Sequence, residues 1–157
     1  MEMLVAASVF AALVALATGA FIHSLRNQRL ILAVMAVNDN TSLVLEQMAR
    51  EMRVARDFDV PRGQMRNEIQ FTDQNLQKIA YRFEDNAIKR RVGDDPTVPF
   101  LPVTSRNVYV DYLDFERTDP SDIEPIRITI AFGVHHTAPG LSEEVVSRIQ
   151  TTVTVRE

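Results

Sequence analysis

The chain has 157 residues, 46% of them hydrophobic, and 17 basic against 21 acidic side chains give a formal net charge of −4. It contains no cysteine, which excludes a disulfide scaffold, a thiolate nucleophile and a cysteine-ligated metal site. The acidic balance argues against a general nucleic-acid binder, because neutralising phosphates needs a surplus of basic side chains on one face. The length allows one modest domain, or a smaller domain with an extended element.

Residues 1–22 are predicted to form a membrane-spanning helix. Residues 3–22 carry no charge, and twenty helical residues rise roughly 30 Å, which is the thickness of the hydrocarbon core of a bilayer. A cleaved signal peptide would begin with basic residues, whereas here Glu2 occupies that place. The sequence therefore favours a segment that is retained in the membrane.

Two features of this span leave alternatives open. Its seven alanines, together with Ser8 and Gly19, would let helices approach closely in a membrane, or would simply fill a single anchor. Glu2 lies beside an apolar stretch, where a carboxylate is expensive if it is drawn into hydrocarbon. Glu2 therefore marks either the end of the helix at the membrane interface or a site at which a cation binds.

Residues 23–60 are predicted to continue the helix as an amphipathic, soluble half. No proline precedes Pro61, and Gly19 is the only glycine before Gly63. An apolar run at residues 30–37 is too short to span a membrane and should meet protein. Between residues 43 and 58, one apolar stripe recurs at helical spacing and should pack on a sheet. Residues 38–42 are poor helix formers, where the rod could break.

Residues 61–157 are predicted to form an antiparallel sheet, which makes the fold class α+β. Short alternating or β-branched runs are separated there by turn residues. Asp85 and Asn86, which both tolerate positive φ, should form a tight hairpin. Residues 93–102 and 137–142 are predicted to be loops. The expected strands cover residues 68–72, 78–84, 87–91, 108–116, 126–134 and 149–156.

No group of residues predicts an enzyme, a cofactor site or a metal site. His135 and His136 are consecutive, so a strand would point them to opposite faces. Asp94 and Asp95 supply too few oxygens for calcium. The basic run at residues 89–91 is typical of a protected strand end, and no serine has a recognisable acid–base partner.

The start of the chain resembles the type IV pilin and pseudopilin family. The motif is Glu2-Met3-Leu4-Val5-Ala6 running directly into the apolar helix; a long helical rod follows, and then a sheet domain that closes on Thr-Val-Thr-Val-Arg. The resemblance implies a pilin-like fold, with a long N-terminal helix packed on a C-terminal sheet. It also implies a basic leader ending in glycine upstream of Met1, which an inner-membrane prepilin peptidase would remove.

The resemblance further implies a role for particular residues of the span. Glu2 would pair with the amino terminus of a neighbouring subunit, so that its desolvation is offset only in the correct register. The other residues that the resemblance implies for helix packing in the membrane or filament core are Leu4, Val5, Ala6, Val9, Phe10, Leu13 and Gly19.

By this resemblance the chain would be a structural minor subunit of a type IV pilus-like or type II secretion pseudopilus filament. Its partners would be other pilin or pseudopilin subunits, an inner-membrane assembly platform and membrane lipid, with no nucleic acid expected. The chain would cross the bacterial inner membrane once, with its C-terminal domain outside the cytoplasm. Arg26 and Arg29, taken alone, would place that side in the cytoplasm. The alternative is a membrane-anchored extracytoplasmic binding or assembly-factor domain that does not polymerise.

Overall fold

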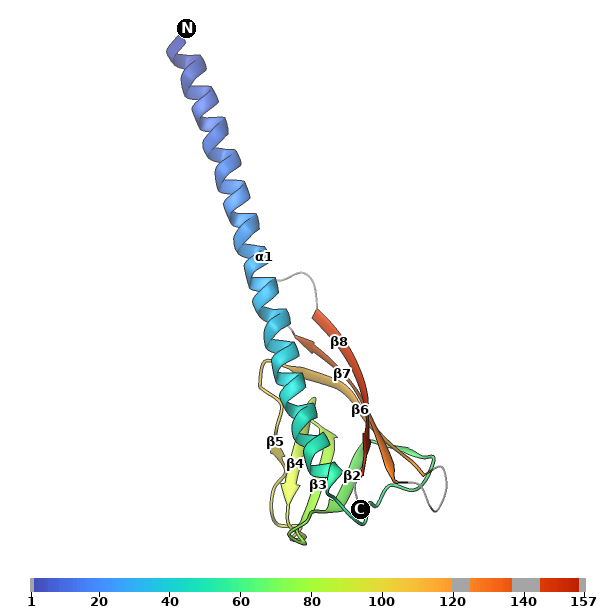
Figure 1. Cartoon of the computed structure of the whole chain (residues 1–157). Helices are drawn as coiled ribbons and strands as arrows, with labels where there is room; N and C mark the ends of the chain where they lie inside the picture. The colour runs from blue at the N-terminus through green and yellow to red at the C-terminus, as the bar shows by residue number, and fades with distance from the viewer. Residues whose placement is uncertain (1, 120–124, 137–144, 156–157) are drawn as a thin grey trace.

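A single long helix dominates the molecule. The computed structural model describes residues 2–119, 125–136 and 145–155. Helix α1 spans Glu2–Arg53, and its 52 residues give a rod about 78 Å long. The N-terminal half projects away from the rest of the chain, while the C-terminal half lies across the sheets (Figure 1). The predicted α+β arrangement of a long helix on antiparallel sheet is confirmed.

The helix continues without interruption through residues 38–42, where the sequence allowed a break. Two of these poor helix formers have specific partners in the folded chain. The Thr41 hydroxyl is buried and donates to the Val37 carbonyl at 2.6 Å. The Asn40 side-chain oxygen accepts from the Ser105 amide at 3.2 Å. The burial of Thr41 and the tertiary contact of Asn40 with Ser105 therefore outweigh the weak local propensity here.

The helix ends at Arg53, so the expectation of a helix to residue 60 is wrong at this boundary. The following residues run extended along the sheet instead. Arg56 and Thr72 exchange two main-chain hydrogen bonds of 2.8 Å, and Asp57 adopts a φ of 54°. Ala55 and Phe58 are buried as the apolar stripe predicts, but from an extended segment rather than from a helix.

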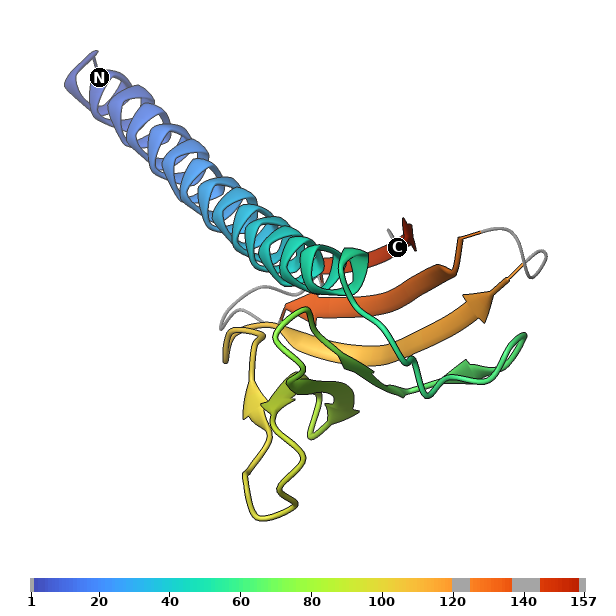
Figure 2. The ribbon, with the colours of Figure 1, turned by 60° about the horizontal axis from the view of Figure 1, so that its bottom comes forward.

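The described residues contain eight strands in two antiparallel sheets, where the sequence indicated one sheet. The first sheet has the order β1-β6-β7-β8 and the second β2-β3-β4-β5. Figure 2 shows α1 lying over the first sheet, with the second sheet beside it. The strands are β1 (Met65–Arg66), β2 (Glu68–Thr72), β3 (Lys78–Glu84), β4 (Ala87–Val92), β5 (Leu101–Pro102), β6 (Tyr109–Thr118), β7 (Arg127–His136) and β8 (Val145–Thr154).

The predicted strands are all present, with shifts of up to four residues at their ends. β2 and β3 have the predicted bounds, and β4 gains one residue. The two-residue strands β1 and β5 were not predicted, and β5 occupies the end of the expected loop at residues 93–102. The second expected loop, at residues 137–142, lies outside the described residues.

One hydrophobic core lies between α1 and the two sheets. Helix α1 packs on β7 and β8. Val44, Met48 and Met52 of the predicted stripe are buried there, together with inward side chains of both sheets such as Phe71 and Phe132. The core therefore fixes only the C-terminal half of α1.

Candidate functional site: the uncovered half of helix α1

The N-terminal half of α1 leaves its apolar side chains uncovered. Every residue from 2 to 22 is exposed, and Leu16, for example, retains 72% of its accessible surface. A contiguous apolar surface of this kind on a folded chain marks an interface with lipid or protein. The helix is long and apolar enough to cross a membrane.

The two hydroxyl groups of this half are satisfied within the helix. Ser8 donates to the Val5 carbonyl and Thr18 donates to the Val14 carbonyl, each at 2.8 Å. An unsatisfied polar group costs several kcal/mol in hydrocarbon, where water is absent. Internal bonding therefore removes the main polar cost of placing residues 3–22 in a bilayer.

Glu2 lies in the first turn of α1, where a carboxylate is favoured by the positive end of the helix dipole. None of the described residues meets this exposed carboxylate in a hydrogen bond or an ion pair. If the helix enters hydrocarbon, any neutralising group for Glu2 must come from beyond the described part of this chain.

The seven residues that the resemblance assigned to packing do not share one face. At 3.6 residues per turn, Ala6, Val9 and Leu13 follow Glu2 along one side, and Val5 and Phe10 flank that stripe. Leu4 lies on nearly the opposite side. The geometry therefore brings together the acid and one apolar stripe.

Gly19 is not packed against any other described part of the chain. A Cβ atom built on it would meet nothing within 4 Å, apart from the backbone of its own helix. Glycine inside a helix is unfavourable by about 1 kcal/mol relative to alanine. No contact within the described chain explains glycine at this position. Close approach of another helix therefore stays the hypothesis for it.

The second apolar run of the helix is only half covered. Ala33 and Val37 are buried against the sheet domain, as expected of residues 30–37. Ile31, Leu32 and Met35 of the same run point away from the sheets and remain more than half exposed. The uncovered apolar surface therefore extends beyond the predicted span.

A polar contact fastens the other end of α1 to the second sheet. Glu51 forms an ion pair of 3.0 Å with Arg90 of β4 and accepts a 2.8 Å hydrogen bond from the Tyr81 hydroxyl of β3. Burial, and then the nearby Glu51 charge, raise the pKa of Tyr81 far above its ordinary value. The rod and the domain are thus joined by charge as well as by apolar packing.

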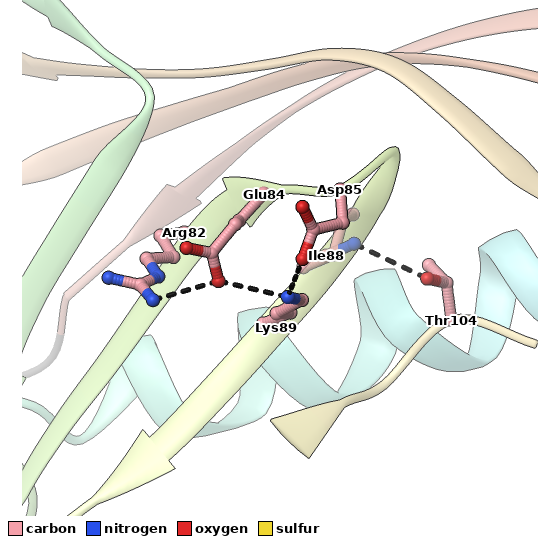
Figure 3. A network of polar contacts seen from close by, with 6 residues as sticks. All are labelled: Arg82, Glu84, Asp85, Ile88, Lys89 and Thr104. Atoms are coloured by element: carbon pink, nitrogen blue, oxygen red, sulfur yellow. Dashed lines mark hydrogen bonds and ion pairs between the residues drawn. The ribbon is translucent and has the colours of Figure 1, made fainter. Parts of the chain in front are cut away.

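The basic run at residues 89–91 is engaged within the chain. Lys89 bonds to Glu84 and Asp85, and Glu84 also accepts from Arg82 (Figure 3). Hydrogen bonds from Lys89 and then Arg82 hold the pKa of Glu84 below its ordinary value. Arg91, like Arg82, lies over the Phe100 ring, with its guanidinium carbon 4.6 Å from the centroid.

Two further candidate polar residues, His135 and Asp94, have partners elsewhere in the sheet domain. His135 bonds to Asp111 at 2.6 Å and stacks on Tyr109, while Asp94 pairs with Lys78. Among residues 2–119, 125–136 and 145–155 the structure shows no group of three or more acidic or histidine side chains that could hold a metal ion.

Comparison with known families, with curated proteins and with solved structures found no match to this chain.

Sequence reasoning missed the contact of Glu51 with Tyr81 and Arg90. The three residues lie far apart in sequence, and only the position of the second sheet beside the C-terminal half of the helix brings them together (Figure 2). The one local signal was Glu51 itself, an acid next to Met52 at the border of the apolar stripe.

Proposed function

We propose that this chain is a structural minor subunit of a type IV pilus-like or type II secretion pseudopilus filament. Its N-terminal helix would sit in the bacterial inner membrane before assembly and in the filament core afterwards. The sheet domain would face the extracytoplasmic side throughout.

The observation that carries the proposal is the division of α1 into two halves. One half is fixed to the domain by the core and by Glu51, whereas the other leaves a full membrane thickness of apolar surface uncovered. A rod of this kind can exchange lipid for neighbouring rods without any change in its own fold.

Glu2 gives the proposal its specificity. A carboxylate at the threshold of the apolar rod resists movement into an apolar environment unless a cation meets it. The amino terminus of a neighbouring subunit would supply that charge in one axial register only. The Glu2 carboxylate would therefore disfavour all other axial registers between neighbouring helices and favour the one in which it meets the amino terminus.

Glu2→Ala tests the proposal in the bacterium that makes the protein, with incorporation into sheared filaments or isolated priming complexes as the readout. We expect normal membrane insertion and at least about a tenfold loss of incorporation, which is the effect of roughly 1.4 kcal/mol. Glu46→Ala is the matched control, because Glu46 is an exposed acid on the same helix whose pairing with Arg50 lies at the surface.

Unchanged incorporation of the Glu2→Ala chain would refute the assembly role of this acid. A wild-type chain that stays monomeric in the membrane, in cells that assemble filaments, would instead support the anchored domain that does not polymerise.

A further inference from the structure

Strand β8 is an edge strand of the first sheet, and no described strand other than β7 pairs with it. It pairs with β7 over ten register positions without a bulge. Because Val155 donates to the Ile126 carbonyl at 2.9 Å, and hydrogen-bonded pairs alternate along antiparallel strands, the main-chain groups of every second residue point away from β7. The residues with outward main-chain groups are Val146, Arg148, Gln150, Thr152 and Thr154.

These outward main-chain groups meet no main-chain partner within the described part of the chain. The five side chains are exposed as well. An edge of this length with unpaired donors and acceptors is a template for another strand, which is why proteins normally block such edges.

The other edges of the two sheets are protected. β1 and β5 have two residues each, and β5 ends in Pro102, which lacks an amide hydrogen. The outer edge of β2 is covered by the extended segment after α1, through two bonds between Arg56 and Thr72 and one from the Asp59 amide to Gln70. β8 has no proline and no bulge, and Arg148 is its only charged side chain.

The direction of β8 disfavours a second copy as the partner. Two identical edges pair symmetrically when they run antiparallel. β8 runs in the same direction as α1 (Figure 1), so antiparallel pairing would point the two apolar rods in opposite directions. Two chains anchored in one membrane cannot do this. Head-to-tail pairing with a copy would need a second long free edge, which the described strands do not provide.

We propose that β8 accepts an added strand from a different subunit of the same assembly. The partner segment would be extended, about five residues or longer, and would carry an acidic side chain opposite Arg148, for which no described residue supplies a counter-ion. The proposal rests on the proposed filament function, because that function supplies the sibling subunits.

Gln150→Pro in the full chain tests this pairing. The Gln150 amide points outward, so proline removes one donor to the added strand and leaves the bonds between β7 and β8 in place. Gln150→Ala is the matched control, because it loses the same side chain and keeps the amide. We expect about a tenfold lower recovery of the Pro variant in the assembled complex, and recovery of the Ala variant at the wild-type level.

Hydrogen exchange provides the second readout. In the assembled complex, the amides of Arg148, Gln150 and Thr152 should exchange at least about tenfold more slowly than they do in the purified chain. Rapid exchange of these amides in the complex, or wild-type recovery of the Pro variant, would overturn the proposal. Loss of assembly in Glu2→Ala with normal assembly in Gln150→Pro would leave the filament function intact and reject only the added strand.

Discussion

Tyr81 is a polar residue inside the hydrophobic core that connects the sheets to helix α1. The side chain is fully buried, and its hydroxyl reaches the Glu51 carboxylate on α1. Phe71 packs beside its ring, with centroids 6.3 Å apart. The phenol thus joins the apolar core to the ionic contact that holds the helix.

Tyr81→Phe should lower stability and change its pH dependence. At neutral pH we expect a loss of about 1 kcal/mol for the missing hydrogen bond. In the native chain, burial raises the pKa of Tyr81 above its ordinary value of 10.0. Its contribution to stability is therefore complete below about pH 10 and is lost as pH rises above that value, because the unfolded phenol ionises first. The Phe variant should lack this part of the alkaline decline.

Urea unfolding of the full chain in detergent, followed at neutral and alkaline pH, measures both effects. Tyr109→Phe is the matched control, because this phenol is 39% exposed and should leave the alkaline decline in place. An equal alkaline decline in wild type and Tyr81→Phe would contradict this interpretation of Tyr81.

For the helix and the strands, the sequence predicted those features that depend on residues close together in the chain. β3 follows from the alternation of Ile79, Tyr81 and Phe83 with Ala80, Arg82 and Glu84. The turn after it follows from two residues that tolerate positive φ. The structure gives Asp85 and Asn86 φ values of 52° and 55°, as a two-residue hairpin of type I′ requires. The apolar stripe of Val44, Met48 and Met52 was likewise found from its period.

Asn86→Ala should destabilise this hairpin, whereas Asn86→Gly should not. A left-handed conformation costs alanine about 1 kcal/mol, because its Cβ approaches the following carbonyl, and glycine has no Cβ. The main-chain bond from the Val110 amide to Asn86 remains available in both variants. Urea midpoints of the two variants check the prediction. Equal midpoints for Asn86→Ala and the wild type would show that the turn tolerates a Cβ.

The elements that sequence missed depend on distant partners. β1 and β5 have two residues each and exist because β6 and β4 lie beside them. The early end of α1 has the same origin: residues after Arg53 gain main-chain bonds to β2 that a longer helix would forgo. No periodicity in the sequence could indicate either event, nor the division of the strands into two sheets.

The candidate site was more accessible to sequence reasoning than the fold around it. The length, lack of charge and small residues of the span are local properties, and the exposure of residues 2–22 agrees with them. The incomplete cover of residues 30–37 was not foreseeable, because which side of that run meets the sheets depends on the docking of α1.

The whole molecule is a long helix whose C-terminal half is packed on the sheets and whose N-terminal half leaves its apolar side chains exposed. The C-terminal half is held by the core and by the ion pair of Glu51 with Arg90, so the orientation of the rod relative to the sheet edge at β8 is fixed. Lateral packing through α1 and strand addition at β8 would therefore place a neighbouring subunit in the same relative orientation. Each contact would preorganise the other.

Because none of the 157 residues is a cysteine, engineered cysteines can measure directly whether the apolar half of α1 is covered in the membrane and in filaments. Single cysteines at Leu13, in the apolar half, and at Gln74, an exposed residue of the turn before β3, can be treated with a membrane-impermeant maleimide in cells whose outer layer is permeable to it, and then in sheared filaments. We predict rapid labelling of Gln74→Cys and none of Leu13→Cys in both preparations, because lipid and then neighbouring rods cover that half of α1. Equal labelling of the two positions would show that neither lipid nor neighbouring helices cover this half of α1.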